Sequence, residues 1–99
     1  PASAVLDLEK ALPNLQDGRL ARTALGVSLA LTGQAERARD LLDASLRQAA
    51  SPPALFGRAL AFYTLKQKTE ALSDIESALR LAPRTPRFEE LRDKIRALP

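Results

Sequence analysis

The feature that most constrains this chain is a pattern that occurs twice within its 99 residues, at a spacing of 33 positions. Each copy, residues 25–46 and residues 58–79, has the pattern of two helices folded back on each other, with small residues where the helices would touch. A unit of this size cannot bury its apolar face alone, so neighbouring copies have to stack. The repeat therefore predicts an all-α chain made of consecutive antiparallel helical hairpins.

Apolar periodicity and turn residues place about six helices along the chain. The periodic stripes predict helices over 2–12, 19–32, 35–49, 52–66, 69–81 and 85–98. Gly33 is a typical helix stop, and the pairs Ser51-Pro52 and Thr85-Pro86 each indicate an N-cap followed by a proline in the first turn. Gly26 lies within a helix, where glycine costs about 1 kcal/mol relative to alanine, so we expect a neighbouring helix to approach closely there.

The residue types argue against an enzyme. The chain has no cysteine and no histidine, which excludes disulfides and thiolate metal sites and removes the usual acid–base group. Catalysis would rest on carboxylates, lysine, Tyr63 or a hydroxyl, and no set of nucleophile, base and orienting group can be assembled from them. The like-charged pairs Glu36–Asp40 and Glu70–Asp74 have a spacing that allows cation binding, but we expect them on solvated helix faces. The expectation is no catalysis, no cofactor and no metal.

The net charge of +3 is concentrated at the end of the sequence. From residue 80 onward, the basic residues are Arg80, Arg84, Arg87, Arg92, Lys94 and Arg96, and the acidic ones are Glu89, Glu90 and Asp93. A basic stretch of this kind has two interpretations: a patch for nucleic acid or another anionic ligand, or the solvated face of a terminal helix. The interspersed acids and the absence of a nucleic-acid-binding motif favour the second.

No apolar run reaches the ~20 residues of a membrane span, so we expect a soluble chain without membrane insertion. The sequence begins at Pro1 and contains no methionine, which favours a segment of a longer protein. Arginine outnumbers lysine, a bias typical of a bacterium with GC-rich DNA. The compartment, bacterial cytoplasm or periplasm, stays open.

The two copies resemble the tetratricopeptide repeat family, whose pattern combines large, small and alanine positions over a helical hairpin. The first copy, about 19–51, has Leu25, Gly26, Leu29, Ala38, Leu42 and Ser45 at those positions. The second, about 52–84, has Leu55, Ala59, Phe62, Ala71, Ile75, Ala78 and Pro83. Residues 2–12 resemble the second helix of an earlier copy, and 85–98 a capping helix. The departures are Arg22, Arg58, Ala50 and Lys66, which stand where a large residue, a leucine, the closing proline and a turn glycine are typical.

The resemblance implies a right-handed α-solenoid whose first helices line a concave groove. By the family's geometry the groove positions would be Leu20, Thr23, Val27, Leu31, Phe56, Leu60 and Tyr63. Members that clamp a C-terminal carboxylate use lysine and asparagine where this chain has Thr23 and Val27, which argues against that ligand. A mostly apolar groove instead suits an amphipathic helix or a hydrophobic segment of another protein.

The resemblance thus implies a non-catalytic scaffold for protein–protein interaction, with Phe56, Leu60 and Tyr63 as anchors. The alternative is a structural role, either as a spacer in a longer repeat array or as a homodimerisation segment. In that case the groove would be covered by the chain itself or by a second copy, since buried and binding surfaces have the same composition.

Overall fold

The computed structural model describes residues 18–99, and these residues form five α-helices. The helices are α2 (Arg19–Leu31), α3 (Ala35–Gln48), α4 (Pro52–Thr64), α5 (Lys68–Leu81) and α6 (Pro86–Arg96). Residues 18–99 contain no strand, so the expected all-α class is confirmed for this part of the chain. The helix expected over 2–12 lies outside the described residues.

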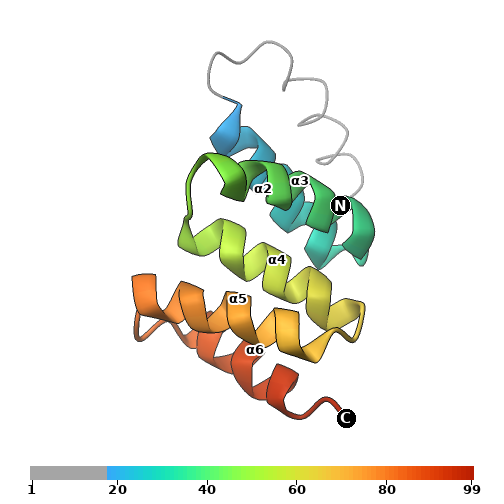
Figure 1. The fold of residues 1–99 in the computed structure, drawn as a ribbon, viewed down its shortest axis with the longest axis vertical. Helices are drawn as coiled ribbons and strands as arrows, with labels where there is room; N and C mark the ends of the chain where they lie inside the picture. The colour runs from blue at the N-terminus through green and yellow to red at the C-terminus, as the bar shows by residue number, and fades with distance from the viewer. Residues whose placement is uncertain (1–17) are drawn as a thin grey trace.

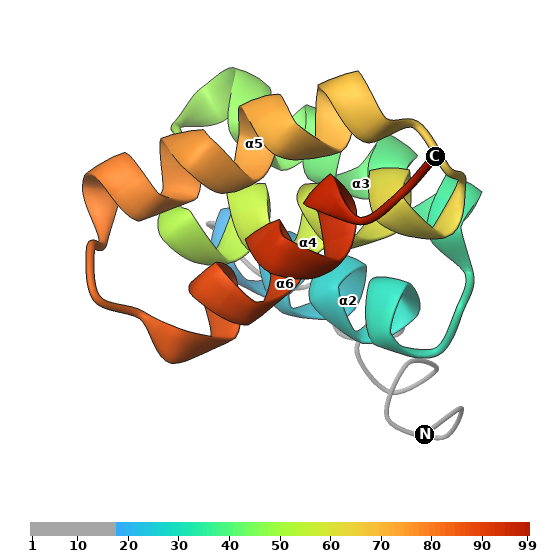
Figure 2. The ribbon, with the colours of Figure 1, turned by 90° about the horizontal axis from the view of Figure 1, so that it is seen from below.

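The five helices stack in chain order, each antiparallel to the one before it, along the longest dimension of 40 Å (Figure 1). Seen along the stack, α3 and α5 lie on one side, and α2 and α6 lie on the other (Figure 2). The central helix is α4, which packs against α2, α3 and α5. The last helix, α6, packs mainly on α5 and makes far fewer contacts with α4.

The buried positions follow the period of the sequence. The residues that face the core from the second helix of each hairpin are no more than 1% exposed, namely Ala38, Leu42 and Ser45 of α3 and Ala71, Ile75 and Ala78 of α5. Each residue of the first set lies 33 positions before its counterpart in the second. The two hairpins therefore use equivalent positions to bury their apolar faces.

The close helix approach predicted at Gly26 is confirmed. A Cβ atom at Gly26 would lie 2.5 Å from Cγ of Leu42, closer than two carbon atoms can come. Gly57 in α4, which sequence analysis did not single out, faces the same side chain, because a Cβ there would lie 2.8 Å from Cδ1 of Leu42. The Leu42 side chain thus fills the space between two helices that each carry a glycine at the contact.

The first helix of each hairpin ends in the same turn. Gly33 after α2 and Lys66 after α4 both adopt the left-handed conformation, with φ of 85° and 61°. In each turn the following amide donates back to the helix, Gln34 N to Leu29 O at 2.9 Å and Gln67 N to Phe62 O at 2.8 Å. The turn glycine that the second copy lacks is therefore replaced by a lysine held in a conformation that favours glycine.

Replacing Lys66 with glycine is expected to raise the free energy of unfolding by up to about 1 kcal/mol, because glycine reaches the left-handed region without a steric penalty. The exposed Lys66 side chain forms no hydrogen bond or ion pair with residues 18–99 that the change would remove. Urea denaturation followed by circular dichroism measures the effect. Gly33→Ala, the reverse change at the equivalent position, is the control and should lower the free energy of unfolding by a similar amount. A destabilised Lys66→Gly variant would contradict the interpretation.

The two predicted N-caps differ in the structure. The Ser51 hydroxyl accepts a hydrogen bond from Ala54 N at 3.3 Å, so this cap is confirmed. Thr85 occupies the N-cap position of α6, but its hydroxyl donates to Ala82 O at 2.7 Å and accepts no bond from the helix. The side-chain cap expected there is wrong, because the hydroxyl is turned toward Ala82 O of the preceding turn and away from the amides of α6.

An ion-pair network occupies the position where the second copy has arginine in place of leucine. Arg58 of α4 donates two hydrogen bonds to the Asp74 carboxylate of α5, at 2.7 and 2.8 Å. A third bond, of 2.9 Å, joins Arg58 to Asp43 of α3. Hydrogen bonding to Asp74 raises the pKa of Arg58 above its ordinary value, burial opposes this, and Asp43 adds to the rise.

The expectation that the Glu70–Asp74 pair lies on a solvated face is wrong for Asp74. This side chain is only 5% exposed, whereas Glu70 is exposed. A carboxylate can be buried here because Arg58 supplies a counter-charge from the neighbouring helix and binds both of its oxygens. The network therefore links three helices, α3, α4 and α5.

Candidate functional site

A hollow of about 230 Å³ lies on the face formed by α2, α4 and α6, and we call it the α6 hollow. Its lining residues are Leu31, Phe56, Leu60, Tyr63, Arg87, Glu90, Leu91 and Lys94. The apolar members come from all three helices, and the charged members come only from α6. Four of the seven residues predicted from the sequence, Leu31, Phe56, Leu60 and Tyr63, are thus brought together.

The wall that α6 contributes is held in place by aromatic contacts. The ring of Phe88 stacks on the ring of Phe56, with centroids 5.2 Å apart and an angle of 24° between the planes. The Arg87 guanidinium lies over the same Phe56 ring, 4.9 Å from its centroid. Such contacts are each worth about 1 kcal/mol, so they fix the first turn of α6 against α4.

The predicted residues around this hollow differ in how far a partner can reach them. Phe56 is only 8% exposed, because Phe88 and Arg87 cover it. Leu60 and Tyr63 are half-buried, and Leu31 is 59% exposed. The surfaces offered to a partner are therefore those of Leu31, Leu60 and Tyr63, while Phe56 supports them from beneath.

The other three predicted residues lie around a second hollow of about 590 Å³, which we call the α2 hollow. It is lined by Leu20, Thr23, Ala24, Val27, Ser51 and Pro53. Leu20 is strongly exposed, but Thr23 is buried and its hydroxyl contacts Ser45 Oγ at 2.6 Å and Arg19 O at 2.9 Å. The Thr23 hydroxyl therefore forms its hydrogen bonds inside the protein. The single groove expected from the sequence is divided into two hollows.

The charged rim of the α6 hollow, formed by Arg87, Glu90 and Lys94, was not predicted from the sequence. Glu90 and Lys94 lie one turn apart, with Oε1 and Nζ separated by 4.0 Å. The apolar stripe of the last helix was visible in the sequence, but the orientation of α6 relative to α4 was not. That orientation depends on the Phe56–Phe88 contact, which joins residues far apart in the chain.

The chemistry available at both hollows is binding through burial of apolar surface. Within residues 18–99, no group of three or more carboxylate, histidine or cysteine side chains is arranged to hold a metal ion. None of the described helices has the length and apolar character needed to cross a lipid bilayer. Comparison with protein-family models, curated proteins and solved structures finds no significant match to this chain.

Proposed function

We propose that this chain is a short segment of the tetratricopeptide type, a right-handed α-solenoid that binds a peptide or helix of another protein and performs no catalysis. The equivalent buried positions of the two hairpins and their shared helix-ending turn support the repeat interpretation. The small residues at Gly26 and Ala59 stand at matching positions, both of them buried.

The observation that carries the binding function is the α6 hollow. Its reachable floor is the apolar surface of Leu31, Leu60 and Tyr63, and its rim carries the charges of α6. An amphipathic helix would place apolar side chains against such a floor and polar ones along the rim, as in other helix-in-groove complexes. Tyr63 adds a phenol that can form a hydrogen bond at the edge of the contact.

The experiment is selection of 15-residue segments from a displayed peptide library, followed by affinity measurement with the purified chain. Leu60→Glu and Tyr63→Glu should each weaken binding at least about 30-fold, the loss expected for a central contact residue. Thr69→Glu is the matched control, because Thr69 is exposed on α5 beside a different depression. Peptides that bind all three variants equally well would show that the hollow is not the site.

A structural role is the second candidate, and the α2 hollow is the observation that favours it. This hollow lies between α2 and the first turn of α4 and has the strongly exposed Leu20 on its wall, which suits packing against another segment of a longer array or a second copy. Light scattering of the isolated chain separates the two functions. A concentration-dependent dimer that Leu20→Glu disrupts supports the structural role, whereas a monomer that binds peptide supports the first proposal.

A further inference from the structure

The hairpins bring the ends of five helices to one side of the molecule, the N-termini of α2, α4 and α6 and the C-termini of α3 and α5 (Figures 1 and 2). We call four arginines and two exposed leucines of this side the arginine edge, made of Arg47, Arg80, Arg84, Arg87, Leu20 and Leu81. Among residues 18–99, Glu89 is the only acidic residue in the terminal turns and connections on this side. The edge therefore has a clear excess of positive charge.

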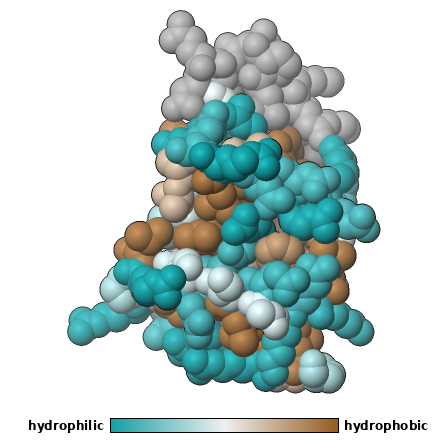
Figure 3. All heavy atoms as spheres, in the orientation of Figure 1, coloured by the Kyte–Doolittle hydropathy of each residue, from teal (hydrophilic) through white to brown (hydrophobic). Residues whose placement is uncertain are grey.

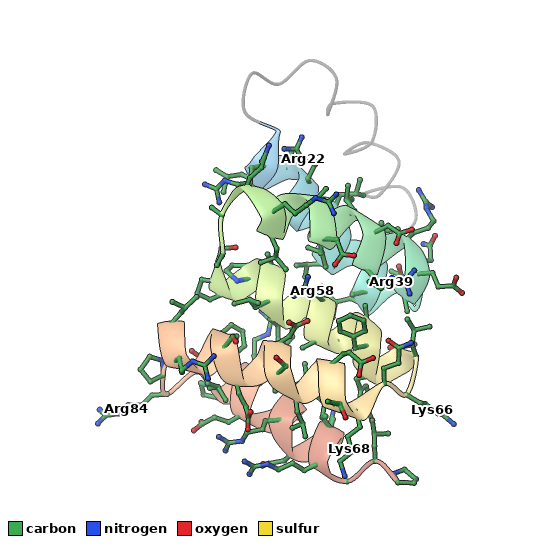
Figure 4. All side chains as sticks on the ribbon, viewed as in Figure 1. Arg22, Arg39, Arg58, Lys66, Lys68 and Arg84 are labelled. Carbon is green, nitrogen blue, oxygen red and sulfur yellow. The ribbon has the colours of Figure 1, made fainter. Side chains whose placement is uncertain are left out.

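The four arginines of the edge are not neutralised by the described part of the chain. Arg80 donates to the Ser77 hydroxyl at 2.9 Å, and Arg87 lies over the Phe56 ring, so both have uncharged partners. Arg47 and Arg84 are exposed and form no ion pair with a described carboxylate. Arg39, Arg58, Arg92 and Arg96, in contrast, each lie beside a carboxylate of residues 18–99. In Figure 4, Arg84 projects from the opposite side of the molecule to Lys66 and Arg39.

Two exposed leucines accompany these cations. Leu20 is 69% exposed and Leu81 is 55% exposed, and together with Leu31 they are the large apolar side chains most open to solvent in residues 18–99. Figure 3 shows hydrophobic surface next to hydrophilic surface along the left-hand side, where the edge lies. A surface that combines arginines with exposed leucines suits the boundary between headgroups and acyl chains.

A nucleic acid fits this surface less well. Single-stranded nucleic acids bind through aromatic side chains on which bases stack, in addition to cations. The aromatic residues nearest the edge, Phe56 and Phe88, are 8% and 7% exposed and stack on each other. The edge therefore offers charge and aliphatic surface, without a platform for bases.

We propose that the arginine edge docks on the surface of an anionic lipid bilayer. The four guanidinium groups contact the headgroup phosphates and carboxylates, while Leu20 and Leu81 enter the interface. Leu31 and Tyr63 of the α6 hollow lie at the opposite ends of α2 and α4 from the edge, so a bilayer leaves them open to a peptide. Arg87 is the one residue of the edge that also lines the hollow. The chain would in this way hold a protein partner at a membrane without spanning it.

Vesicle co-sedimentation tests the proposal, with pure phosphatidylcholine compared with a 7:3 mixture of phosphatidylcholine and phosphatidylserine at low salt. The chain should bind the anionic vesicles and not the neutral ones. Arg47→Gln, Arg80→Gln and Arg84→Gln combined should lower the partition coefficient by about 100-fold, at roughly fivefold per arginine near the surface. Leu81→Gln should lower it severalfold. These four residues do not line the α6 hollow, so peptide binding should be unchanged.

The matched control replaces three cations at the other end of the helices, Arg39→Gln, Lys66→Gln and Lys68→Gln. This variant should retain vesicle binding within about threefold, because only cations that face the bilayer lie within a Debye length of its surface. Absence of binding to anionic vesicles would overturn the proposal, as would an equal loss in both triple variants. Equal affinity of the wild type and Leu81→Gln, together with tight binding of single-stranded oligonucleotides, would overturn it in favour of a soluble polyanion. Circular dichroism verifies that each variant is folded.

Discussion

Replacing Asp74 with alanine is expected to lower the free energy of unfolding by about 3 kcal/mol, because Arg58 then stays charged in a half-buried site without its main partner. Such a loss is a large part of the 5–15 kcal/mol that stabilises an ordinary domain. Equilibrium unfolding in urea, followed by the helical circular dichroism signal, measures it.

Two further variants give the control for this effect. Asp43→Ala should cost less than 1 kcal/mol, because Asp43 is about one-third exposed and forms a single bond with Arg58. Arg58→Leu combined with Asp74→Ala removes both charges and should be more stable than Asp74→Ala alone, since no buried charge is left unpaired. If Asp74→Ala costs no more than Asp43→Ala, the network does not have the role assigned to it.

Replacing Leu42 with alanine is expected to lower the free energy of unfolding by about 3–4 kcal/mol, the loss typical of a fully buried leucine that leaves a cavity. The position is central because the Leu42 side chain contacts both helices that carry a glycine at the interface, α2 at Gly26 and α4 at Gly57. The same urea experiment measures it.

The glycines make this prediction specific. Gly26→Ala alone should be destabilising, because its new Cβ would overlap Leu42 Cγ. In the Leu42→Ala background the same Cβ enters the vacated space, and alanine favours the helix, so Gly26→Ala should recover about 1 kcal/mol. Additive effects of the two changes would contradict the packing described here.

Much of the fold could be predicted from the sequence, because the repeated pattern shows where the helices lie and which of their faces are buried. Gly33 ends α2 and Ser51 begins α4, and both effects act within one turn, so they can be predicted locally. Gly26 predicted a close helix contact, although the sequence did not show which residue makes it. The network of Arg58 could not be predicted. A charge at an apolar position gives no sign of which carboxylates approach it, and Asp43 and Asp74 come from different helices.

The residues of the candidate site were predicted from the sequence, but the shape of the surface that they form was not. The predicted residues of α4 do lie on one face, as the helical period requires, and Leu31 joins them from α2. The two separate hollows could not be foreseen, because one of them has a wall formed by α6, whose Phe88 stacks on Phe56 of α4, far away in the chain. The charges of the arginine edge were visible as a C-terminal excess, but their alignment with Arg47 required the hairpin stack.

Photo-cross-linking of a selected peptide tests whether a partner binds on the face formed by α2, α4 and α6. Benzoylphenylalanine is placed at position 63, in the α6 hollow, or at position 69 on α5, outside that hollow. We expect the bound peptide to be cross-linked from position 63 and not from position 69. Cross-linking from position 69 alone, or from neither position while the peptide remains bound, would contradict it.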